Sequence, residues 1–206
     1  MTSRELSALI SAGLVLAGTV WYIVVAIGGT KVKPVLASWI VLAGTMTLSY
    51  ATYWTSPKHN LVSNACNAAS VLSTLSILAT VIGLNLGNRR KVKFSSFQKW
   101  CLLISGLIAA YWIILVFGLY GTGTIPNILT QILMLIGYLV TAERLWNAEK
   151  NTESLMTWGM IALGSSVAVY TSIVSRDWLA LLYAGRAAIA ATTIVGLMYR
   201  LEKKKS

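Results

Sequence analysis

Seven stretches of apolar residues, each long enough to cross a lipid bilayer, take up almost the whole chain of 206 residues. A helix needs about 20 apolar residues to span the hydrocarbon core of a bilayer. Only 11% of the residues are charged, whereas a soluble domain has about 25%. The stretches are residues 7–27, 35–54, 61–86, 98–119, 126–147, 155–174 and 178–200. The sequence therefore predicts an all-α, multi-pass integral membrane protein, with residues 1–206 forming a single transmembrane domain in the lipid bilayer.

The positive charges predict how this domain is oriented. When the loops between the seven segments are assigned to alternate faces, thirteen Lys and Arg residues fall on one face and three on the other. The thirteen are Lys31, Lys33, Arg89, Arg90, Lys91, Lys93, Lys99, Arg144, Lys150, Arg200, Lys203, Lys204 and Lys205, and the three are Arg4, Lys58 and Arg176. Cytoplasmic loops carry an excess of Lys and Arg, so we expect the N-terminus outside and the C-terminus in the cytoplasm. The net charge of +11 is then a topology signal and does not indicate a nucleic-acid partner, and we expect the protein in a prokaryotic cytoplasmic (inner) membrane.

An offset of 119 residues relates the first three segments to the last three. KPVLASW, which ends at Trp39, aligns with TESLMTW, which ends at Trp158, and the register also pairs Gly18 with Gly137 over an ungapped alignment of residues 7–81. The paired segments cross the membrane in the same direction, whereas a competing offset of 92 residues pairs segments that cross in opposite directions. We therefore predict two parallel three-helix repeats joined by a linker helix (3+1+3). The predicted units are a first repeat at 1–86, a basic loop and linker helix at 87–121, and a second repeat with a basic tail at 122–206.

This plan resembles the SWEET/PQ-loop (SemiSWEET-like) superfamily of small seven-helix transporters. The nicotinamide riboside transporters have a similar plan and are the second family that the sequence resembles. The resemblance implies a carrier that works by alternating access between its two repeats. It also implies a polar residue on the third helix of each repeat, facing a shared pocket, and an aromatic residue on the second helix against the substrate. The proline–glutamine hinge of the family has no counterpart in the expected segments, so the paired Gly18 and Gly137 are the candidate hinge.

Arg186 lies near the middle of the last apolar segment. In the 119-residue register it aligns with Asn67, and Tyr183 aligns with Asn64, so the resemblance implies that these four residues face the shared pocket. An arginine at mid-helix costs roughly 2.5–3.5 kcal/mol on insertion, and such residues usually face the protein interior or an aqueous cavity. The carboxylate or phosphate of a ligand could pair with the guanidinium through two parallel hydrogen bonds. The structural alternatives are an arginine that reaches from lipid toward the membrane surface and one that bonds helix carbonyls.

Other candidate residues follow from their depth in the membrane. Counting from the helix ends puts Gln131, Tyr50 and Tyr170 at the level of Arg186, where they could contact the solute. Trp39 and Trp158 are only a few residues from the cytoplasmic face. They line an inner gate or belong to the aromatic belt at the membrane interface, and the sequence leaves both alternatives open.

The predicted function is transport of a small polar solute, anionic or zwitterionic, by a uniporter, because no Asp, Glu or His lies at mid-membrane to relay a proton. The alternative is a non-transporting seven-helix receptor or sensor that binds a small ligand in the same pocket. We expect neither an enzyme nor a cofactor, because the segments hold no carboxylate pair, histidine cluster or Ser/His arrangement. The one histidine, His59, has no acidic cluster nearby and predicts no metal site. A homo-oligomer is compatible with the sequence.

Overall fold

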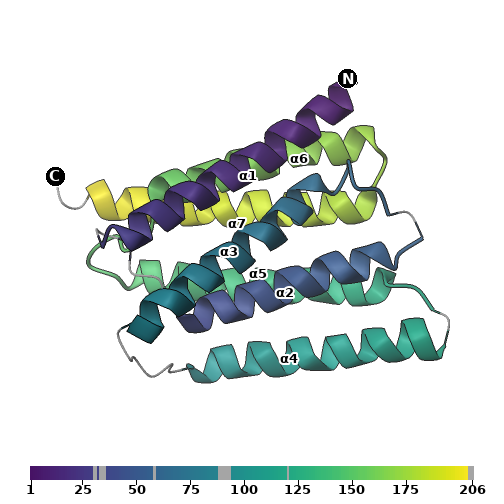
Figure 1. Cartoon of the computed structure of the whole chain (residues 1–206), viewed down its shortest axis with the longest axis horizontal. Helices are drawn as coiled ribbons and strands as arrows, with labels where there is room; N and C mark the ends of the chain where they lie inside the picture. Colours follow the sequence, from purple (N-terminus) through teal and green to yellow (C-terminus); the bar gives the residue numbers. More distant parts are fainter. Residues whose placement is uncertain (30–31, 33–35, 58, 88–93, 120, 204–206) are drawn as a thin grey trace.

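The computed structural model is a bundle of long helices (Figure 1). It describes residues 1–206 except 30–31, 33–35, 58, 88–93, 120 and 204–206, and in the helices it leaves out the side chains of 37, 85–87, 98, 136–137 and 140. The elements are α1 (Ser3–Ile27), α2 (Leu36–Trp54), α3 (Ala65–Gly87), α4 (Ser96–Ile113), which continues as the short π-helix η1 (Ile114–Gly118), α5 (Thr124–Trp146), α6 (Leu155–Val174) and α7 (Trp178–Lys203). The described residues form no strand, so the predicted all-α class is confirmed.

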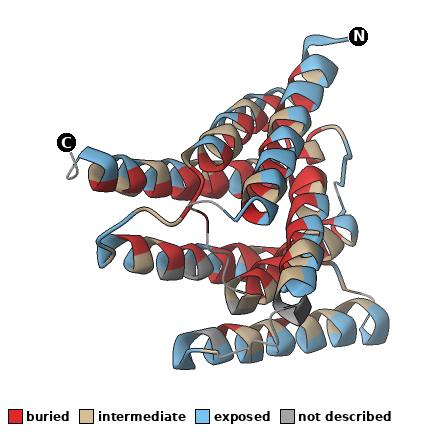
Figure 2. Cartoon of the chain, turned by 60° about the vertical axis from the view of Figure 1, so that its left-hand side comes forward, coloured by how far each residue is buried: buried red, intermediate tan, exposed pale blue. Residues whose placement is uncertain are grey.

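Five helical segments are long and apolar enough to cross a membrane, counted over the described residues alone. They are Ser3–Ile27, Ala65–Leu84, Lys99–Gly118, Leu155–Val174 and Trp178–Lys203. A shorter apolar stretch, Thr124–Leu135, lies in α5. Large apolar side chains such as Val20, Leu107 and Ile189 point outward, and the pale blue outer faces of the helices show how much of the surface is exposed (Figure 2). An apolar surface of this extent requires a lipid environment, as expected for an integral membrane protein.

Six of the helices pack in a closed cycle, and α4 lies outside this cycle against α2 and α5 (Figure 1). Around the cycle α1 packs against α6, α6 against α7, α7 against α5, α5 against α2, α2 against α3, and α3 against α1. The third helix, α3, also contacts α6 and α7. The inward faces of α2, α3, α5 and α7 are therefore brought close to one another.

Small residues let α1 and α6 approach closely. A Cβ atom added to Gly164 would lie 2.9 Å from the carbonyl oxygen of Ser11, and the Ser11 hydroxyl donates to the Gly164 carbonyl at 2.8 Å. Further along, the Thr157 hydroxyl donates to the carbonyl of Gly18 at 3.2 Å. Membrane helices commonly associate through such small residues and hydrogen bonds. Gly18 thus lies at a tight helix–helix contact.

The start of α7 is held by Asp177, whose side chain is buried. One carboxylate oxygen, Oδ2, accepts hydrogen bonds from the hydroxyls of Tyr53 and Ser63, each at 2.5 Å. The other, Oδ1, accepts the backbone N–H of Ala180 at 3.1 Å, which is the interaction of an N-cap residue with a free amide of the first turn. This network joins α7 to α2 and to the segment before α3, and so fixes the helix that carries Arg186.

Candidate functional site

Arg186 lies inside the bundle and is only 8% exposed. Its Nε donates to Oε1 of Gln131 on α5 at 3.0 Å. The guanidinium carbon lies 5.1 Å from the ring centroid of Tyr183 and 5.5 Å from that of Tyr138, within the range of cation–π attraction. Burial rules out an arginine that reaches through lipid, and neither Nη1 nor Nη2 bonds a helix carbonyl among the described residues.

A chain of hydrogen bonds extends from Arg186 across three further helices. Nε2 of Gln131 donates to the hydroxyl of Ser49 on α2 at 2.8 Å, and Nδ2 of Asn67 on α3 donates to the same hydroxyl at 3.4 Å. Nδ2 of Asn127, one turn before Gln131 on α5, donates to the Ser49 carbonyl at 2.8 Å. We call these five residues the Ser49 network. Asn67 and Arg186, which the 119-residue register aligns, thus belong to one network.

Several polar atoms in and beside the Ser49 network are buried without a hydrogen-bond partner in the described part of the chain. They are Nη1 and Nη2 of Arg186, Oδ1 of Asn67, and both amide atoms of Asn64. Asn64 and Asn67 are each 1% exposed and are one helical turn apart. A buried polar group without a partner costs about 1–3 kcal/mol. Donors and acceptors that remain free together at such a cost indicate a place that a ligand or water occupies.

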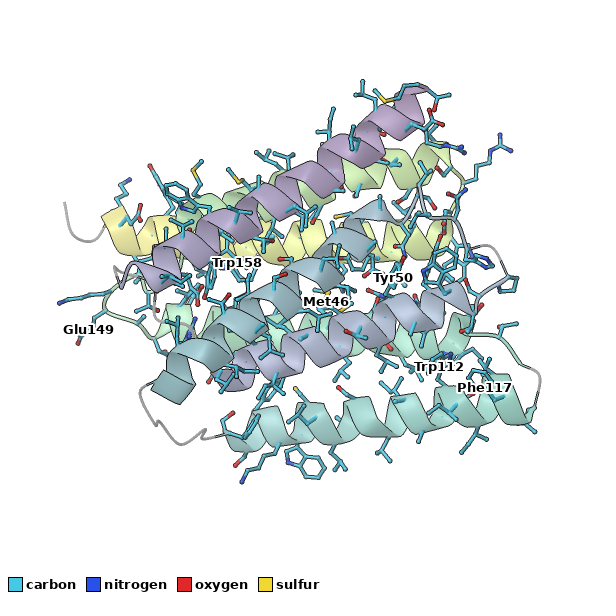
Figure 3. The ribbon with its side chains drawn as sticks, viewed as in Figure 1. Met46, Tyr50, Trp112, Phe117, Glu149 and Trp158 are labelled. Atoms are coloured by element: carbon cyan, nitrogen blue, oxygen red, sulfur yellow. The ribbon has the colours of Figure 1, made fainter. Side chains whose placement is uncertain are left out.

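The aromatic residues lie beside this network and continue toward the end of the bundle where α1 and α5 end. The rings of Tyr138 and Trp158 meet edge to face with centroids 5.9 Å apart, as do those of Tyr22 and Trp39 at 5.2 Å. Trp39 and Trp158 line one cavity of about 30 Å³ together with Tyr138 and Met46, which is room for about one or two water molecules. Figure 3 labels two of these residues, Met46 on α2 and Trp158 on α6. Both tryptophans are buried, whereas residues of an interfacial belt face lipid. Trp39 and Trp158 therefore lie inside the bundle and do not face lipid.

Trp158 is also held from the loop that precedes α6. Its Nε1 donates to Oε2 of Glu153 at 3.3 Å, and Oε1 of Glu153 forms an ion pair with Arg144 near the end of α5. Burial raises the pKa of the Glu153 carboxyl, and the positive charge of Arg144 opposes this shift. The ion pair is thus a buried connection between α5, α6 and one of the two cavity tryptophans.

Some predicted site residues are not brought to the Ser49 network. Tyr50 is half-buried and packs its ring against Trp54 at 5.9 Å, and Tyr170 is 50% exposed on α6. Counting residues from the helix ends predicted the depth of Tyr50 and Tyr170 in the membrane, but it did not predict whether their side chains face the inside of the bundle. Gly18 lies at the contact between α1 and α6, and the surroundings of Gly137 in α5 lie outside the described residues.

Sequence reasoning missed three residues of the site, namely Ser49, Asn127 and Tyr138. A usable signal was present for two of them. Asn127 and Gln131 are four residues apart and therefore on one face of α5. Ser49 belongs to a polar stripe with Thr45 and Thr52, at spacings of four and three residues along α2. The signal for Tyr138 is weaker, because three of its neighbours along the helix face, Met134, Leu135 and Ala142, are apolar and one, Thr141, is polar.

Comparison of this chain with family models, with curated proteins and with solved structures finds no match. The site is therefore interpreted from its own residues. Among the described residues no group of three His, Cys, Asp or Glu side chains could hold a metal ion. The fold and the site together define a helical integral membrane protein with a buried polar network, part of which has no hydrogen-bond partner among the residues that the structure describes.

Proposed function

We propose that this protein is a membrane transporter that carries a small polar solute through the Ser49 network. The observation that carries the proposal is that Asn67 and Arg186, from the two halves of the chain, belong to one network in which buried polar atoms remain unpaired. Transporters built from repeats hold their substrates near the bilayer midplane, at the interface between the repeats. A network with free donors and acceptors at that place is suited to binding a polar solute.

The helix boundaries support the 3+1+3 plan on which this proposal depends. α1 and α5 end at Ile27 and Trp146, which differ by 119 residues, and α2 and α6 end at Trp54 and Val174, which differ by 120 residues. The packing partners are exchanged in the same way. The contact of α1 with α6 corresponds to that of α5 with α2, and the contacts of α3 with α1 and α2 correspond to those of α7 with α5 and α6. α4 is then the linker helix.

The proposed orientation has the C-terminus in the cytoplasm and the N-terminus outside. Many of the charges that predict it lie outside the described residues, namely Lys31, Lys33, Lys58, Arg89, Arg90, Lys91, Lys93, Lys204 and Lys205. Among the described ones, Arg200 near the end of α7 donates to the carbonyl of Trp146 at 2.9 Å and stacks on its ring at 4.2 Å. The basic ends of α5 and α7 therefore meet at one end of the bundle, which supports the assignment of that end to the cytoplasm. A prokaryotic cytoplasmic membrane is the proposed location.

Uniport by alternating access is the proposed mechanism. The cavity of about 30 Å³ beside the tryptophans leaves no room for a solute, so the arrangement corresponds to a closed state. The bundle must open to one side to admit a solute, and the two repeats are the units that could move against each other. The two buried carboxylates, Glu153 and Asp177, immediately precede the N-terminal ends of α6 and α7. This position at the helix ends supports uniport without a proton relay through the membrane.

Uptake into proteoliposomes tests the proposal. Vesicles containing the purified protein are incubated with a defined mixture of sugars, amino acids, organic acids and nucleosides, washed, and analysed by mass spectrometry against protein-free vesicles. We expect one chemical class to accumulate to its external concentration. Gln131→Ala, which disconnects Arg186 from Ser49, should reduce the rate at least tenfold. The matched control is Thr193→Val, since Thr193 is exposed on α7 and bonds its own helix. Binding of a solute without uptake would favour the receptor alternative and refute transport.

A further inference from the structure

We propose that the Ser49 network binds a small carboxylate that also carries a hydrogen-bond donor, either a hydroxyl or an ammonium group. This inference deepens the proposed function, on which it rests for the movement of the solute but not for its binding. It depends on which atoms the network leaves unpaired.

The guanidinium of Arg186 has one edge available for a ligand. Nε is occupied by Gln131 at 3.0 Å, whereas Nη1 and Nη2 are buried and unpaired. The rings of Tyr138 and Tyr183 lie against the guanidinium, so its N–H edge is where a ligand can approach. Two neighbouring Nη donors in one plane match the two oxygens of a carboxylate. A neutral ligand would leave the positive charge of Arg186, which is only 8% exposed, uncompensated, and this is unfavourable for a buried charge.

A carboxylate is favoured over phosphate by the charge of the site. Arg186 is the one cationic side chain that the described residues bring to the Ser49 network, and the other members, Ser49, Asn67, Asn127 and Gln131, are neutral. A single guanidinium balances one negative charge. A phosphate with between one and two charges near neutral pH would keep part of its charge uncompensated. The site therefore suits a monoanion.

The asparagines require a donor on the same ligand. Oδ1 of Asn67 and Oδ1 of Asn64 are buried acceptors without a partner, and a carboxylate has no hydrogen to give them. Asn67 connects to Arg186 through only two side chains, because Ser49 accepts from both Asn67 and Gln131, and Gln131 accepts from Arg186. A ligand whose carboxylate pairs with the arginine therefore needs a hydroxyl or ammonium group to donate to the asparagines.

Calorimetric titration of the purified protein in detergent tests this inference with matched probes. L-Lactate, 3-hydroxybutyrate and L-alanine carry both groups, propionate has only the carboxylate, and propane-1,2-diol has only the hydroxyls. We expect at least one of the first three to bind at least tenfold more tightly than propionate, and the diol not to bind. Inorganic phosphate should bind more weakly than the preferred carboxylate. Whether a hydroxy acid or an amino acid binds better identifies the donor.

Two variants connect the binding to the named atoms. Arg186→Gln should reduce the affinity for the preferred probe at least tenfold. Asn64→Leu keeps the size of the side chain, and because both amide atoms of Asn64 are unpaired, we expect the variant to fold as well as the parent. It should bind the preferred probe and propionate with more nearly equal affinity, an effect that a merely structural asparagine would not produce. This variant keeps the test valid if Arg186→Gln does not fold.

The inference is overturned if none of the hydroxy or amino acids binds, if phosphate or the diol binds most tightly, or if Asn64→Leu leaves the preference over propionate unchanged. These outcomes are distinct from failure of the proposed function. Tight binding of a carboxylate without uptake into proteoliposomes refutes transport and leaves the binding inference intact. Uptake of a neutral solute refutes the binding inference and leaves transport intact.

Discussion

Tyr53 connects the end of α2 to the start of α7, and the substitution Tyr53→Phe measures how much this connection stabilises the fold. The Tyr53 side chain is 1% exposed. Its hydroxyl donates to Oδ2 of Asp177 at 2.5 Å and accepts the backbone N–H of Asn60 at 2.7 Å. Phenylalanine keeps the ring and its packing, so the substitution removes these two hydrogen bonds and the contacts of the hydroxyl with the Asn60 carbonyl at 3.0 Å and the Ser63 hydroxyl at 3.3 Å.

The two hydrogen bonds contribute unequally to the expected loss. A hydrogen bond to a charged group contributes about 1.5–3 kcal/mol. Asp177 keeps its bonds from Ser63 and from the backbone of Ala180, so its charge is not left without partners. Asn60 is exposed, and water can replace the hydroxyl that its N–H loses. We therefore expect Tyr53→Phe to lower the free energy of unfolding by about 2 kcal/mol.

Reversible unfolding in mixed micelles, followed by circular dichroism against the mole fraction of denaturing detergent, measures this change. The matched control is Tyr199→Phe, because Tyr199 lies on α7 and its side chain is exposed. The control should change the free energy of unfolding by less than about 0.5 kcal/mol, as is usual for surface substitutions. An equally small change for Tyr53→Phe would refute the reasoning, since it would mean that the hydroxyl does not stabilise Asp177.

Two further predictions use the same unfolding assay. Arg144→Ala should lower the free energy of unfolding by about 3 kcal/mol, because Glu153 is only 6% exposed and would be left as a buried charge. Glu153→Gln should lower it clearly less, because Arg144 is 33% exposed and reaches water. Equal losses for the two variants would contradict this reasoning. Burial raises the pKa of Glu153. The contribution of Glu153 to stability is therefore greatest below its ordinary pKa and falls as pH rises through the raised pKa. Glu153→Gln should remove this fall and flatten the pH–stability curve over that pH range. Gly164→Ala should destabilise the protein because the new Cβ would lie 2.9 Å from the Ser11 carbonyl oxygen. The control Gly159→Ala, on the same helix with open space around it, should be neutral or stabilising. Equal effects of the two variants would refute the tight contact of α1 with α6.

The helices could be predicted from the sequence because each predicted segment is a long apolar stretch, as a helix that crosses a membrane requires. The predicted segment 155–174 coincides with α6, and the other segments agree with the helices to within a few residues. Arg186 and Asn67 could also be predicted, since a charged or amide side chain within an apolar segment is conspicuous. Gln131 could be predicted for the same reason, because it is an amide side chain within an apolar segment. It accepts a hydrogen bond from Arg186 and connects to Asn67 through the Ser49 hydroxyl.

The face of each helix was harder to predict than the level. Successive residues on a helix are rotated by about 100°, so Ser49 and Tyr50 share a level but point in different directions. Choosing Tyr50 by depth missed Ser49, which links α2 to α3 and α5 through its hydrogen bonds. The polar spacing of Thr45, Ser49 and Thr52 would have indicated the inward face of α2. The unpaired atoms of Asn64 could not be predicted, because they depend on side-chain positions from several helices.

Paired and unpaired asparagines in the same region should differ in what they contribute to stability, and this difference separates a ligand site from a structural network. Nδ2 of Asn127 donates to the Ser49 carbonyl at 2.8 Å and to the Thr52 hydroxyl at 3.1 Å, whereas Asn64 is equally buried and has no partner for its amide atoms. Asn127→Leu breaks these two bonds and the one that Oδ1 of Asn127 accepts from Gln131 at 3.5 Å, and it should lower the free energy of unfolding by about 2 kcal/mol. Asn64→Leu removes a polar group without a described partner and should leave the free energy of unfolding unchanged or raise it. If both variants are destabilised alike in the unfolding assay, the Asn64 amide has partners and is structural. If only Asn127→Leu is destabilised, the chain keeps Asn64 at a cost to its own stability, and a bound solute is the partner that offsets that cost.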